Sequence, residues 1–409
     1  MNQVRLLHIV GGSSFGGAAK IILRLAQKMK ADGWQVDILT TDPVFGAAAT
    51  RQGLGVMALD VIRREIRPWW DLRGLFRLYT FLRRERYLVV HTHTSKAGFV
   101  GRLAAWLAGV SVIVHTAHGF AFHERSPRAT RAFYSALERL ASHWCDRIVS
   151  VTEFHRRRAL DLGICSMHKI VAIPNGIAGE EPTSLIATVE LRRSWQARPG
   201  EPVLLTVGRL APEKGLEHLL EAASLLRRMG QGFRVVLAGD GPLRAPLERL
   251  AENLRVGDLV TFLGYREDIA DLLAASDLVV LPSLREGLSI ALLEAMAAGK
   301  AIVATRIGGN MAVLSQPDAA ILVRPGDPQA LCDAILQCCA DPALRARLGI
   351  NARLLFKSRY TEDRMLNSYR QAYLDLLKAK GPGGARSLRQ VFRSGRIPAR
   401  VKQASLSPR

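Results

Sequence analysis

Two glutamates stand eight residues apart in the segment REGLSIALLEAMAAGK, residues 285–300. Apolar residues at helical spacing predict a helix that begins near Leu288 and ends before Gly299. Glu286 then lies just outside the helix, and Glu294 lies inside it with its side chain pointing back toward the helix start. Both carboxylates therefore flank one helix N-terminus. The alternative is a helix with one glutamate near the positive end of its dipole and the other on a solvated face, and this segment alone does not separate the two interpretations.

The predicted helix start is suited to a phosphate group. The amides of a first helical turn have no partner within the helix and lie at the positive end of its dipole. Here they belong to Gly287, Leu288 and Ser289. Because carboxylates accept hydrogen bonds from hydroxyl groups, Glu286 and Glu294 predict a ligand whose phosphate lies between two hydroxyl-bearing groups, such as a sugar and a ribose.

A second loop, TVGRLAPEKG, carries two cations after a predicted strand. Arg209 and Lys214 could neutralise a diphosphate, because a guanidinium group donates two parallel hydrogen bonds to phosphate oxygens and an ammonium group adds a compact positive charge. Gly208 permits a tight turn in this loop. A solvated surface loop is the alternative. Glycine turns at two more strand ends, AGDGPLR with Asp240 and FLGYREDI with Tyr265, suit a nucleotide base and its ribose.

The elements that must position these loops alternate between strand-like and helix-like runs, which predicts an α/β fold of doubly wound parallel sheets. The first half contains predicted strands at 4–10, 35–40, 87–91, 111–116, 146–152 and 169–175, and predicted helices at 18–31, 71–85, 97–108 and 128–144. The second half contains predicted strands at 203–208, 233–239, 259–264, 277–282, 301–305 and 319–323. Ligands bind beyond the carboxyl ends of such strands, where the residues above are found.

A turn-rich stretch, GIAGEEPTS, separates the two halves. The length of 409 residues also favours two domains over one. We predict a first domain over 1–178, a second over 179–357, and a last helix over 358–380. The composition of 381–409, basic and free of acidic residues, predicts a disordered tail.

The loops of the first half are rich in glycine and histidine. GGSSFGGAAK, residues 11–20, does not match the G-x-G-x-x-G fingerprint, which disfavours a dinucleotide site. Histidines at two later strand ends could form a metal site; they are His91, His93, His115, His118 and His123. No carboxylate cluster accompanies them, so we prefer histidines that hydrogen-bond to the backbone and line a cleft, and we predict no metal ligand.

Taken in order, GRLAPEKG, AGDGPLR, FLGYREDI and EGLSIALLEAMAAGKAIVAT resemble the nucleotide-sugar domain of the retaining family-4 glycosyltransferases. The resemblance covers about residues 4–378. It implies the GT-B fold, in which two Rossmann-like domains face each other across a cleft and the C-terminal helix crosses back to the first domain. It also implies that Glu286 binds sugar hydroxyls, that Glu294 binds the ribose, and that Arg209 and Lys214 hold the diphosphate.

The same resemblance implies that Gly16 and Gly17 approach the donor or acceptor across the cleft, and that His118 lies against the donor sugar. The implied reaction transfers a sugar from a nucleotide diphosphate sugar, with UDP favoured, by front-face attack with retained configuration and without a metal or other cofactor. The expected catalytic residues are His118, Glu286, Arg209 and Lys214. The expected donor-binding residues are Gly16, Gly17, Gly208, Arg209, Lys214, Asp240, Tyr265, Glu286, Gly287, Leu288, Ser289 and Glu294.

The net charge of +21 predicts an anionic partner, which could be nucleic acid, a membrane surface or a phosphorylated ligand. Arginines interleave with aromatic residues between 63 and 87, a pattern that favours an anionic membrane; a helix that buries its aromatic face is the alternative. HTHTSKAG and HTAHGFAFHE resemble, within the family, bacterial enzymes that extend sugars on polyprenyl diphosphate for surface polysaccharides. A lipid-linked acceptor would explain the charge without nucleic acid.

The remaining features favour a cytoplasmic enzyme, peripheral at the inner face of the cytoplasmic membrane. The longest uncharged apolar run, Leu103 to Val114, is shorter than a membrane span, and the five cysteines show no zinc or disulfide pattern. Two alternatives stay open: a transferase that uses a soluble sugar phosphate or another lipid, and a non-catalytic basic binding protein. The sequence does not identify the donor sugar and base, the acceptor, the linkage, the role of the tail or the oligomeric state.

Overall fold

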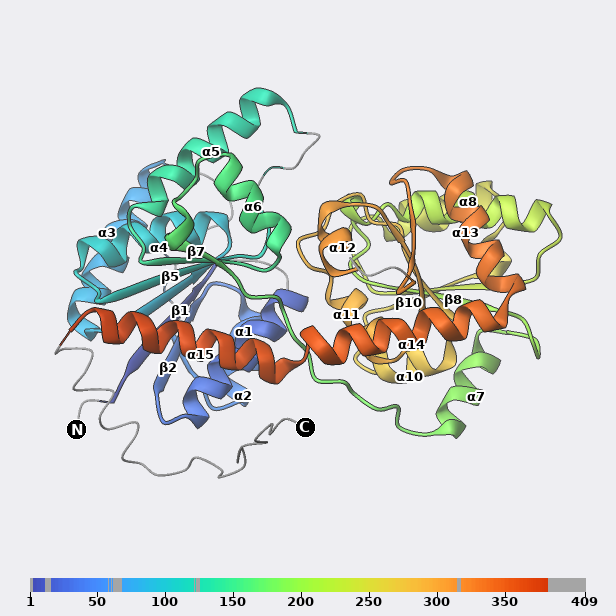
Figure 1. Ribbon diagram of the computed structural model, residues 1–409, viewed down its shortest axis with the longest axis horizontal. Coiled ribbons are helices and arrows are strands. Elements are labelled where there is room, and N and C mark those ends of the chain that lie inside the picture. Colours follow the sequence, from blue (N-terminus) through green and yellow to red (C-terminus); the bar gives the residue numbers. More distant parts are fainter. Residues whose placement is uncertain are drawn as a thin grey trace, which may run out of the picture.

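Two α/β domains lie side by side in a computed structural model of the chain (Figure 1). The structure describes residues 3–11, 16–57, 59, 61, 68–120, 122, 126–314 and 318–381. His123, the arginines at 63, 64 and 67, and the predicted tail beyond 381 lie outside these residues. Parallel sheets with helices on both faces confirm the predicted doubly wound architecture.

The first domain is built on a seven-stranded sheet of order β3-β2-β1-β4-β5-β6-β7, in which every pair is parallel. Its strands are β1 (Arg5–Val10), β2 (Gln35–Thr40), β3 (Gly55–Met57), β4 (Val89–His93), β5 (Val112–Ala117), β6 (Arg147–Ser150) and β7 (Ile170–Ala172). Its helices are α1 (Gly17–Ala31), α2 (Pro43–Arg51), α3 (Pro68–Glu85), α4 (Ser95–Leu107), α5 (Arg128–Ser142) and α6 (Glu153–Asp161), with a short 3-10 turn at Met167–Lys169.

The second domain has a six-stranded parallel sheet of order β10-β9-β8-β11-β12-β13. Its strands are β8 (Val203–Val207), β9 (Arg234–Ala238), β10 (Val260–Gly264), β11 (Leu278–Leu281), β12 (Ala301–Thr305) and β13 (Ile321–Val323). Its helices are α7 (Leu185–Ser194), α8 (Leu216–Arg228), α9 (Arg244–Asn253), α10 (Ile269–Ala275), α11 (Ile290–Ala297), α12 (Gly308–Val313), α13 (Pro328–Ala340) and α14 (Pro342–Arg359), with 3-10 turns at Pro212–Lys214 and Gly257–Leu259.

Several helix starts follow directly from local sequence. Helices α2, α13 and α14 each begin with a proline, whose fixed backbone angle and missing N–H suit the first helical position. The residue before each proline is an aspartate, and its carboxylate accepts a hydrogen bond from an amide of the first turn. The three capping residues are Asp42, Asp327 and Asp341.

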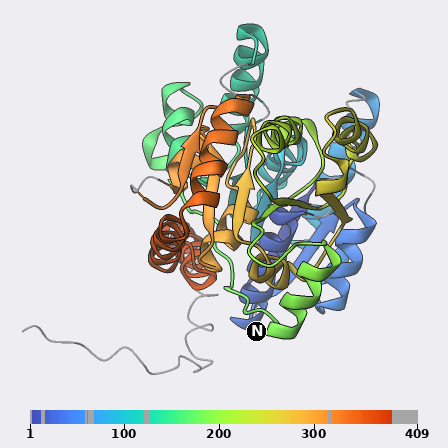
Figure 2. The same ribbon diagram turned by 90° about the vertical axis from the view of Figure 1, so that its right-hand side faces the viewer.

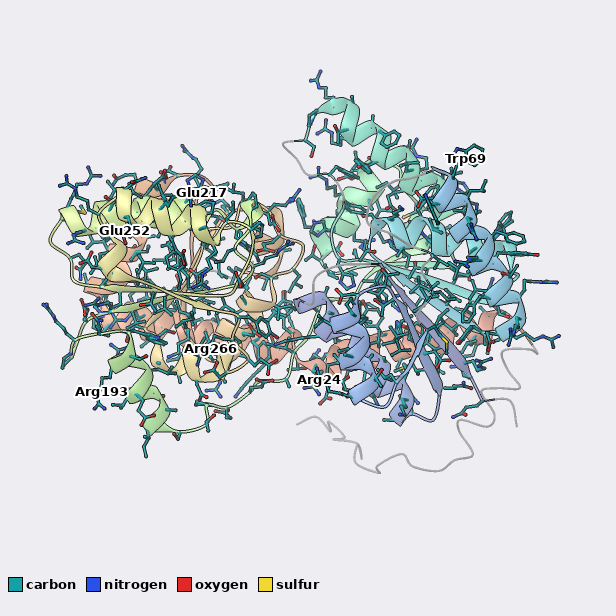
Figure 3. The ribbon with its side chains drawn as sticks, turned by 180° about the vertical axis from the view of Figure 1, so that it is seen from behind. Arg24, Trp69, Arg193, Glu217, Glu252 and Arg266 are labelled. Carbon is teal, nitrogen blue, oxygen red and sulfur yellow. The ribbon has the colours of Figure 1, made fainter. Side chains whose placement is uncertain are left out.

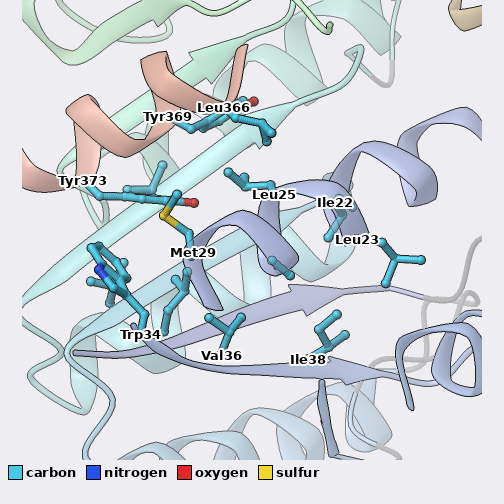
Figure 4. Close-up of a cluster of buried hydrophobic side chains, with 14 of the residues drawn as sticks. Ile22, Leu23, Leu25, Met29, Trp34, Val36, Ile38, Leu366, Tyr369 and Tyr373 are labelled. Atoms are coloured by element: carbon cyan, nitrogen blue, oxygen red, sulfur yellow. The ribbon is translucent and has the colours of Figure 1, made fainter. Parts of the chain in front are cut away.

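The last helix, α15 (Glu362–Ala379), leaves the second domain and packs under the first (Figure 1). Its buried face meets α1 and β5. The ring centroid of Tyr373 lies 5.7 Å from that of Trp34, the residue before β2, and Tyr373 lies next to Met29 of α1 (Figure 4). At its start, Glu362 pairs with Arg24 of α1 at 3.4 Å, and Figure 3 shows Arg24 where the two domains meet. The C-terminal helix is therefore part of the first domain's core.

The chain crosses between the domains twice, and the two crossings are bonded to each other. The amide of Ile177 donates to the carbonyl of Tyr360 at 3.1 Å, and the amide of Glu362 donates to the carbonyl of Ile177 at 3.0 Å. Two short paired segments thus connect the domains, which is the construction expected of a hinge.

The main difference from the predicted elements concerns β4. The prediction placed this strand at 87–91 and assigned the polar residues after it to a loop, whereas the strand runs from Val89 to His93. His91, Thr92 and His93 are all buried in the centre of the sheet, because their side chains find hydrogen-bond partners there. In the first domain, α2, β3 and α6 were not among the predicted elements.

Within the residues described, none of the helices combines the length and apolar character that a membrane crossing requires.

Candidate active site

A cavity of about 610 Å³ opens between the domains, at the carboxyl ends of the strands. Gly16 and the first turn of α1 form one wall, and the loops after β8, β9, β10 and β11 form the other. Most of the residues predicted from the sequence line it together: Gly16, Gly17, Gly208, Arg209, Lys214, Asp240, Tyr265, Glu286, Leu288, Ser289 and Glu294. The structure therefore brings the predicted donor-binding residues to one place.

Lys214 and Glu286 form an ion pair within this cavity. The ammonium nitrogen of Lys214 lies 2.5 Å from Oε1 of Glu286, and the hydroxyl of Ser283 donates to the same oxygen at 2.9 Å. Gly215, at a positive φ of 58°, turns the chain directly after Lys214. Lys214 and Glu286 were predicted to bind different parts of the ligand, whereas the structure pairs them with each other.

Arg209 is an available cation beside that pair. Its side chain is exposed to the cavity and makes no hydrogen bond or ion pair with any residue that the structure describes. Arg266, which also lines the cavity, differs because its guanidinium donates to the carboxylate of Asp268 at 2.7 Å. An unpaired guanidinium at the end of a parallel strand is well placed to bind a diphosphate.

Helix α11 begins later than predicted. Ser289 is its N-cap, and the serine hydroxyl accepts a hydrogen bond from the amide of Leu292 at 3.4 Å. The predicted start near Leu288 is therefore wrong, because serine is a strong capping residue and takes the position outside the helix. The open amides of the first turn begin at Ser289, and the amides of Gly287 and Leu288 belong to the loop before it.

Glu294 lies on the cavity wall, one turn inside α11. Burial raises the pKa of its carboxyl group; Lys20 opposes this shift and Glu180 adds to it. Lys20 reaches the cavity from α1 of the first domain, and the sequence analysis did not single it out. Its position three residues after Gly17 places both on one face of that helix, a signal that could have identified it.

Gly287 is the one predicted donor-binding residue that is absent from the cavity lining. It packs against His118 of the first domain instead, and a Cβ atom at 287 would overlap the carbonyl oxygen of His118. Gly119 lies against Gly287 as well. A glycine is needed here because the two domains touch backbone to backbone.

His118, unlike most of the predicted site residues, is not among the residues that line the cavity; its backbone carbonyl packs against Gly287, on the loop that carries Glu286. Its imidazole is neutral, because burial lowers the pKa of His118 to about 4. Its Nε2 lies 3.2 Å from Nδ1 of His93. A neutral imidazole can donate one hydrogen bond and accept another, so His118 is suited to binding a hydroxyl group.

Three buried histidines nearby have the spacing of a metal site. Among the described residues, nitrogen atoms of His8, His91 and His93 lie within 4.8 Å of one another. However, His8 and His93 are hydrogen-bonded to each other, and both nitrogens of His91 have partners in the hydroxyls of Thr116 and Tyr373. We therefore interpret the group as a hydrogen-bond network. His8 was not among the predicted histidines.

Comparison with known proteins agrees with this geometry. Residues 188–355 match the family described as Glycosyl transferases group 1, and residues 16–176 match the Glycosyl transferase 4-like domain. The chain is also 30% identical, over 383 residues, to the UDP-Gal:alpha-D-GlcNAc-diphosphoundecaprenol alpha-1,3-galactosyltransferase of Escherichia coli, covering 93% of this chain and 99% of that protein. The chain belongs to the group 1 glycosyltransferases.

Solved structures place this glycosyltransferase in the GT-B fold. A glycosyltransferase from Rickettsia africae superposes with a TM-score of 0.77 at 19% identity, covering 92% of this chain and all of that one. HepE from Anabaena, in complex with UDP, superposes with a TM-score of 0.76 at 21% identity, covering 90% of this chain and 99% of that one. The predicted fold and enzyme class are therefore confirmed: the protein is a retaining glycosyltransferase that uses a nucleotide sugar.

Proposed function

We propose that this glycosyltransferase transfers a sugar from a UDP-sugar to a glycan carried on a polyprenyl diphosphate, in the assembly of a bacterial surface polysaccharide. The name of the E. coli relative supports both the UDP donor and the diphosphate-linked lipid acceptor. The observation that carries the donor half is the gathering of Arg209, Lys214 and the α11 N-terminus in one cavity, between Glu286 and Glu294.

In the proposed mechanism, these groups stabilise the departing nucleotide diphosphate. Arg209, Lys214 and the first amides of α11 neutralise the negative charge that develops on the leaving oxygen. The bond from the anomeric carbon to phosphate breaks, the bond to the acceptor oxygen forms on the same face, and the acceptor proton passes to the leaving phosphate. Glu286 and His118 orient sugar hydroxyls, and Glu294 binds the ribose. Transfer needs no metal, since side-chain cations carry out the neutralisation.

The distribution of charge supports a membrane-bound acceptor. Residues 1–178 contain 25 Lys and Arg against 12 Asp and Glu, and residues 381–409 contain seven against none. Residues 179–380, by contrast, are almost balanced, with 25 against 24. The positive field of the protein therefore comes from the first domain and the tail, as expected if these parts face anionic lipid.

The helices α3, α4 and α5, which contact one another in sequence order, also expose large apolar side chains. Trp69 is 83% exposed, Phe76 65%, Trp106 54% and Phe133 59%. Trp69 lies at the outer edge of the first domain in Figure 3, and α5 projects from the body in Figures 1 and 2. We propose that this α3–α5 face docks on the inner face of the cytoplasmic membrane, with aromatic side chains at the headgroup level.

Calorimetric titration with UDP, GDP and their sugar conjugates, with and without a chelator, tests the donor site. Binding of one nucleotide family that the chelator does not change supports the proposed donor chemistry. The same sugar conjugate is then used in a transfer assay with a polyprenyl diphosphate glycan in vesicles. If no nucleotide binds, or if binding and transfer need an added metal ion, the proposed mechanism is wrong.

Co-sedimentation with anionic vesicles tests the α3–α5 face. Replacing Trp69 and Phe76 by serine should reduce binding, because exposed apolar area and basic charge act together. Serine at Leu185 and Ile186 of α7, which are 85% and 72% exposed on the charge-balanced domain, provides the matched control. Equal binding by both double variants would argue against this surface.

A soluble sugar-phosphate acceptor is the competing function. It predicts that transfer proceeds at full rate without vesicles and that the serine substitutions on α3 have no effect on turnover. A nucleic-acid partner is tested separately by a gel shift across a range of salt concentrations. Neither alternative accounts for the exposed aromatic side chains of the basic domain.

A further inference from the structure

Three histidines form a continuous hydrogen-bonded chain from the core of the first domain to His118, whose backbone meets Gly287 of the second domain. Nδ1 of His8 lies 3.0 Å from Nε2 of His93, and Nδ1 of His93 lies 3.2 Å from Nε2 of His118. Successive rings are stacked, with interplanar angles of 27° and 28°. His8 and His93 come from the neighbouring strands β1 and β4, and His118 follows β5.

The nitrogen atom at each end of this histidine chain lacks a hydrogen-bond partner among the described residues. These atoms are Nε2 of His8 and Nδ1 of His118, and both are buried. His8 and His93 are fully buried, and burial lowers the pKa of all three imidazoles far enough to keep them neutral near pH 7. Each ring therefore carries one hydrogen, which it donates at one nitrogen while accepting at the other.

Neutral rings in such a chain have only two consistent arrangements. In one, every ring carries its hydrogen on Nδ1, so that His118 presents an N–H at its free end and His8 leaves a lone pair in the core. In the other, every ring carries its hydrogen on Nε2, so that His118 presents a lone pair and His8 buries an N–H. A mixed arrangement would oppose two donors or two acceptors within the chain.

Each arrangement leaves one buried N–H without a partner among the described residues, on His118 in the first and on His8 in the second. The two ends differ because His8 is fully buried in the core whereas His118 is only partly buried, so the His118 end is the one nearer to solvent and to a ligand oxygen. An unpaired acceptor is tolerated in protein interiors more often than an unpaired N–H. We propose that His8 and His93 hold His118 in the Nδ1–H form, so that His118 acts as a hydrogen-bond donor toward an oxygen of the donor sugar. His8 and His93 are thus positioning residues, and this inference rests on the placement of His118 at the sugar in the proposed function.

The chain is held in place from the side by the crossover helix. The hydroxyl of Tyr373 on α15 lies 2.5 Å from Nδ1 of His91, and Nε2 of His91 lies 2.8 Å from the hydroxyl of Thr116. The ring of His91 in turn lies 4.1 Å from the ring of His93. With both nitrogens occupied, His91 does not compete for the nitrogens of His93, and the chain keeps its order.

Nuclear magnetic resonance of the full-length protein labelled with 15N-histidine reads the arrangement directly. Two-bond 1H–15N correlations distinguish a nitrogen that carries hydrogen from one with a lone pair, and single His-to-Asn variants assign the signals. The expected result is hydrogen on Nδ1 of His8, His93 and His118, without any added substrate. Hydrogen on Nε2 of His118 would overturn the proposal. This measurement does not depend on enzyme activity, so it can contradict the proposed hydrogen arrangement without contradicting the proposed function.

A pair of substitutions at the core end tests the positioning role. The amide nitrogen of His8→Asn lies close to the position of Nδ1 and can still donate to His93, whereas His8→Leu fills the space without a donor. We expect His8→Leu to lower kcat by roughly tenfold, the effect of one lost orienting hydrogen bond, and to give mixed His118 signals. His8→Asn should retain most of the kcat and should keep the hydrogen of His118 on Nδ1. Equal kcat losses in two variants that melt at the same temperature would contradict the positioning role.

Discussion

The ammonium group of Lys214 lies 2.5 Å from Oε1 of Glu286, and this ion pair joins the loops after the neighbouring strands β8 and β11. The two charges neutralise each other inside the cavity. A diphosphate that enters beside Lys214 places the cation between two anions, so the lysine can bind phosphate without losing its hold on the carboxylate. The pair therefore connects the phosphate end of the donor to its sugar end.

Glu286→Gln separates sugar binding by Glu286 from phosphate binding by Lys214. The amide keeps the size of the side chain but removes the charge that pairs with Lys214, so the lysine becomes freer to bind the diphosphate. We expect the transfer rate to fall by roughly a hundredfold, as when one transition-state hydrogen bond is removed, while calorimetry shows UDP binding that is unchanged or tighter. Parallel losses of transfer and of UDP affinity would show that Glu286 does not act on the sugar.

Arg209→Ala and Lys214→Ala should act on the diphosphate itself. Each removes a charge-assisted hydrogen bond, and the double variant should bind UDP roughly a hundredfold more weakly. Arg285→Ala is the matched control, because Arg285 is an exposed arginine on the loop that carries Glu286 but does not line the cavity. Calorimetry compares the UDP affinity of the parent protein, the double variant and Arg285→Ala. An unchanged UDP affinity in the double variant would show that Arg209 and Lys214 do not bind the diphosphate.

Much of this arrangement could be predicted because the relevant residues directly follow predicted parallel strands. Parallel strands bring their carboxyl ends to one edge of the sheet, so the sequence places Arg209 and Glu286 in one site. The exact start of α11 could not be predicted, since it depends on whether Ser289 caps the helix or joins it. The Lys214–Glu286 ion pair also needed the structure, because periodicity carries no information on the reach of a side chain between loops.

The buried histidines show the limit of pattern-based prediction more clearly. His91 and His93 are polar residues in a central strand, where a hydrophobic pattern predicts none. Their burial is stabilised by partners from distant parts of the chain, such as His8 and Tyr373. Such contacts link residues nearly 300 positions apart, and a single sequence does not indicate them.

Gly287→Ala tests the backbone contact between the domains. Its methyl group would overlap the carbonyl oxygen of His118, so the loops must separate and the two halves of the site move apart. A displacement near 1 Å can lower the rate by roughly a hundredfold, and we expect a loss of that size in kcat with little change in melting temperature. Gly179→Ala, whose methyl would make only ordinary contacts at 3.9 Å, should retain its activity. Full activity in Gly287→Ala would mean that this contact is not needed for transfer.

Glu294→Gln should stabilise the unliganded protein and weaken UDP binding at the same time. Burial raises the pKa of Glu294, so its charged form destabilises the fold at neutral pH and this cost disappears as pH falls below the ordinary glutamate pKa of 4.5. The variant should melt at a higher temperature than the parent at neutral pH, with a smaller difference at acid pH, and bind UDP roughly tenfold more weakly. Glu267→Gln, at an exposed glutamate on the loop after β10, should change neither the melting temperature nor the UDP affinity. An unaltered UDP affinity in Glu294→Gln would contradict a ribose contact.

Acid should unfold the first domain before the second. Burial lowers the pKa of six histidines, and all of them lie in residues 1–178: His8, His91, His93, His115, His118 and His155. Their unfolded forms take up a proton near pH 6.5, whereas in the folded protein His8 does so only near pH 3 and His118 near pH 4. Below pH 6.5 the unfolded state therefore binds more protons, and stability should fall by up to about 1.4 kcal/mol per pH unit for each histidine.

Hydrogen exchange measured from pH 7.5 to about pH 5, corrected for the intrinsic pH dependence of exchange, separates the two domains. Peptides from β1, β4 and β5 should lose protection as the pH falls, while peptides from β8 and β11 keep theirs. His155→Gln provides the internal check: this side chain lies outside the His8–His93–His118 chain and bonds to Thr152 at 2.6 Å, so its removal should lessen the acid sensitivity without altering transfer at neutral pH. Simultaneous loss of protection in both domains would show that they unfold as one unit and that the buried histidines do not set the acid limit of the first.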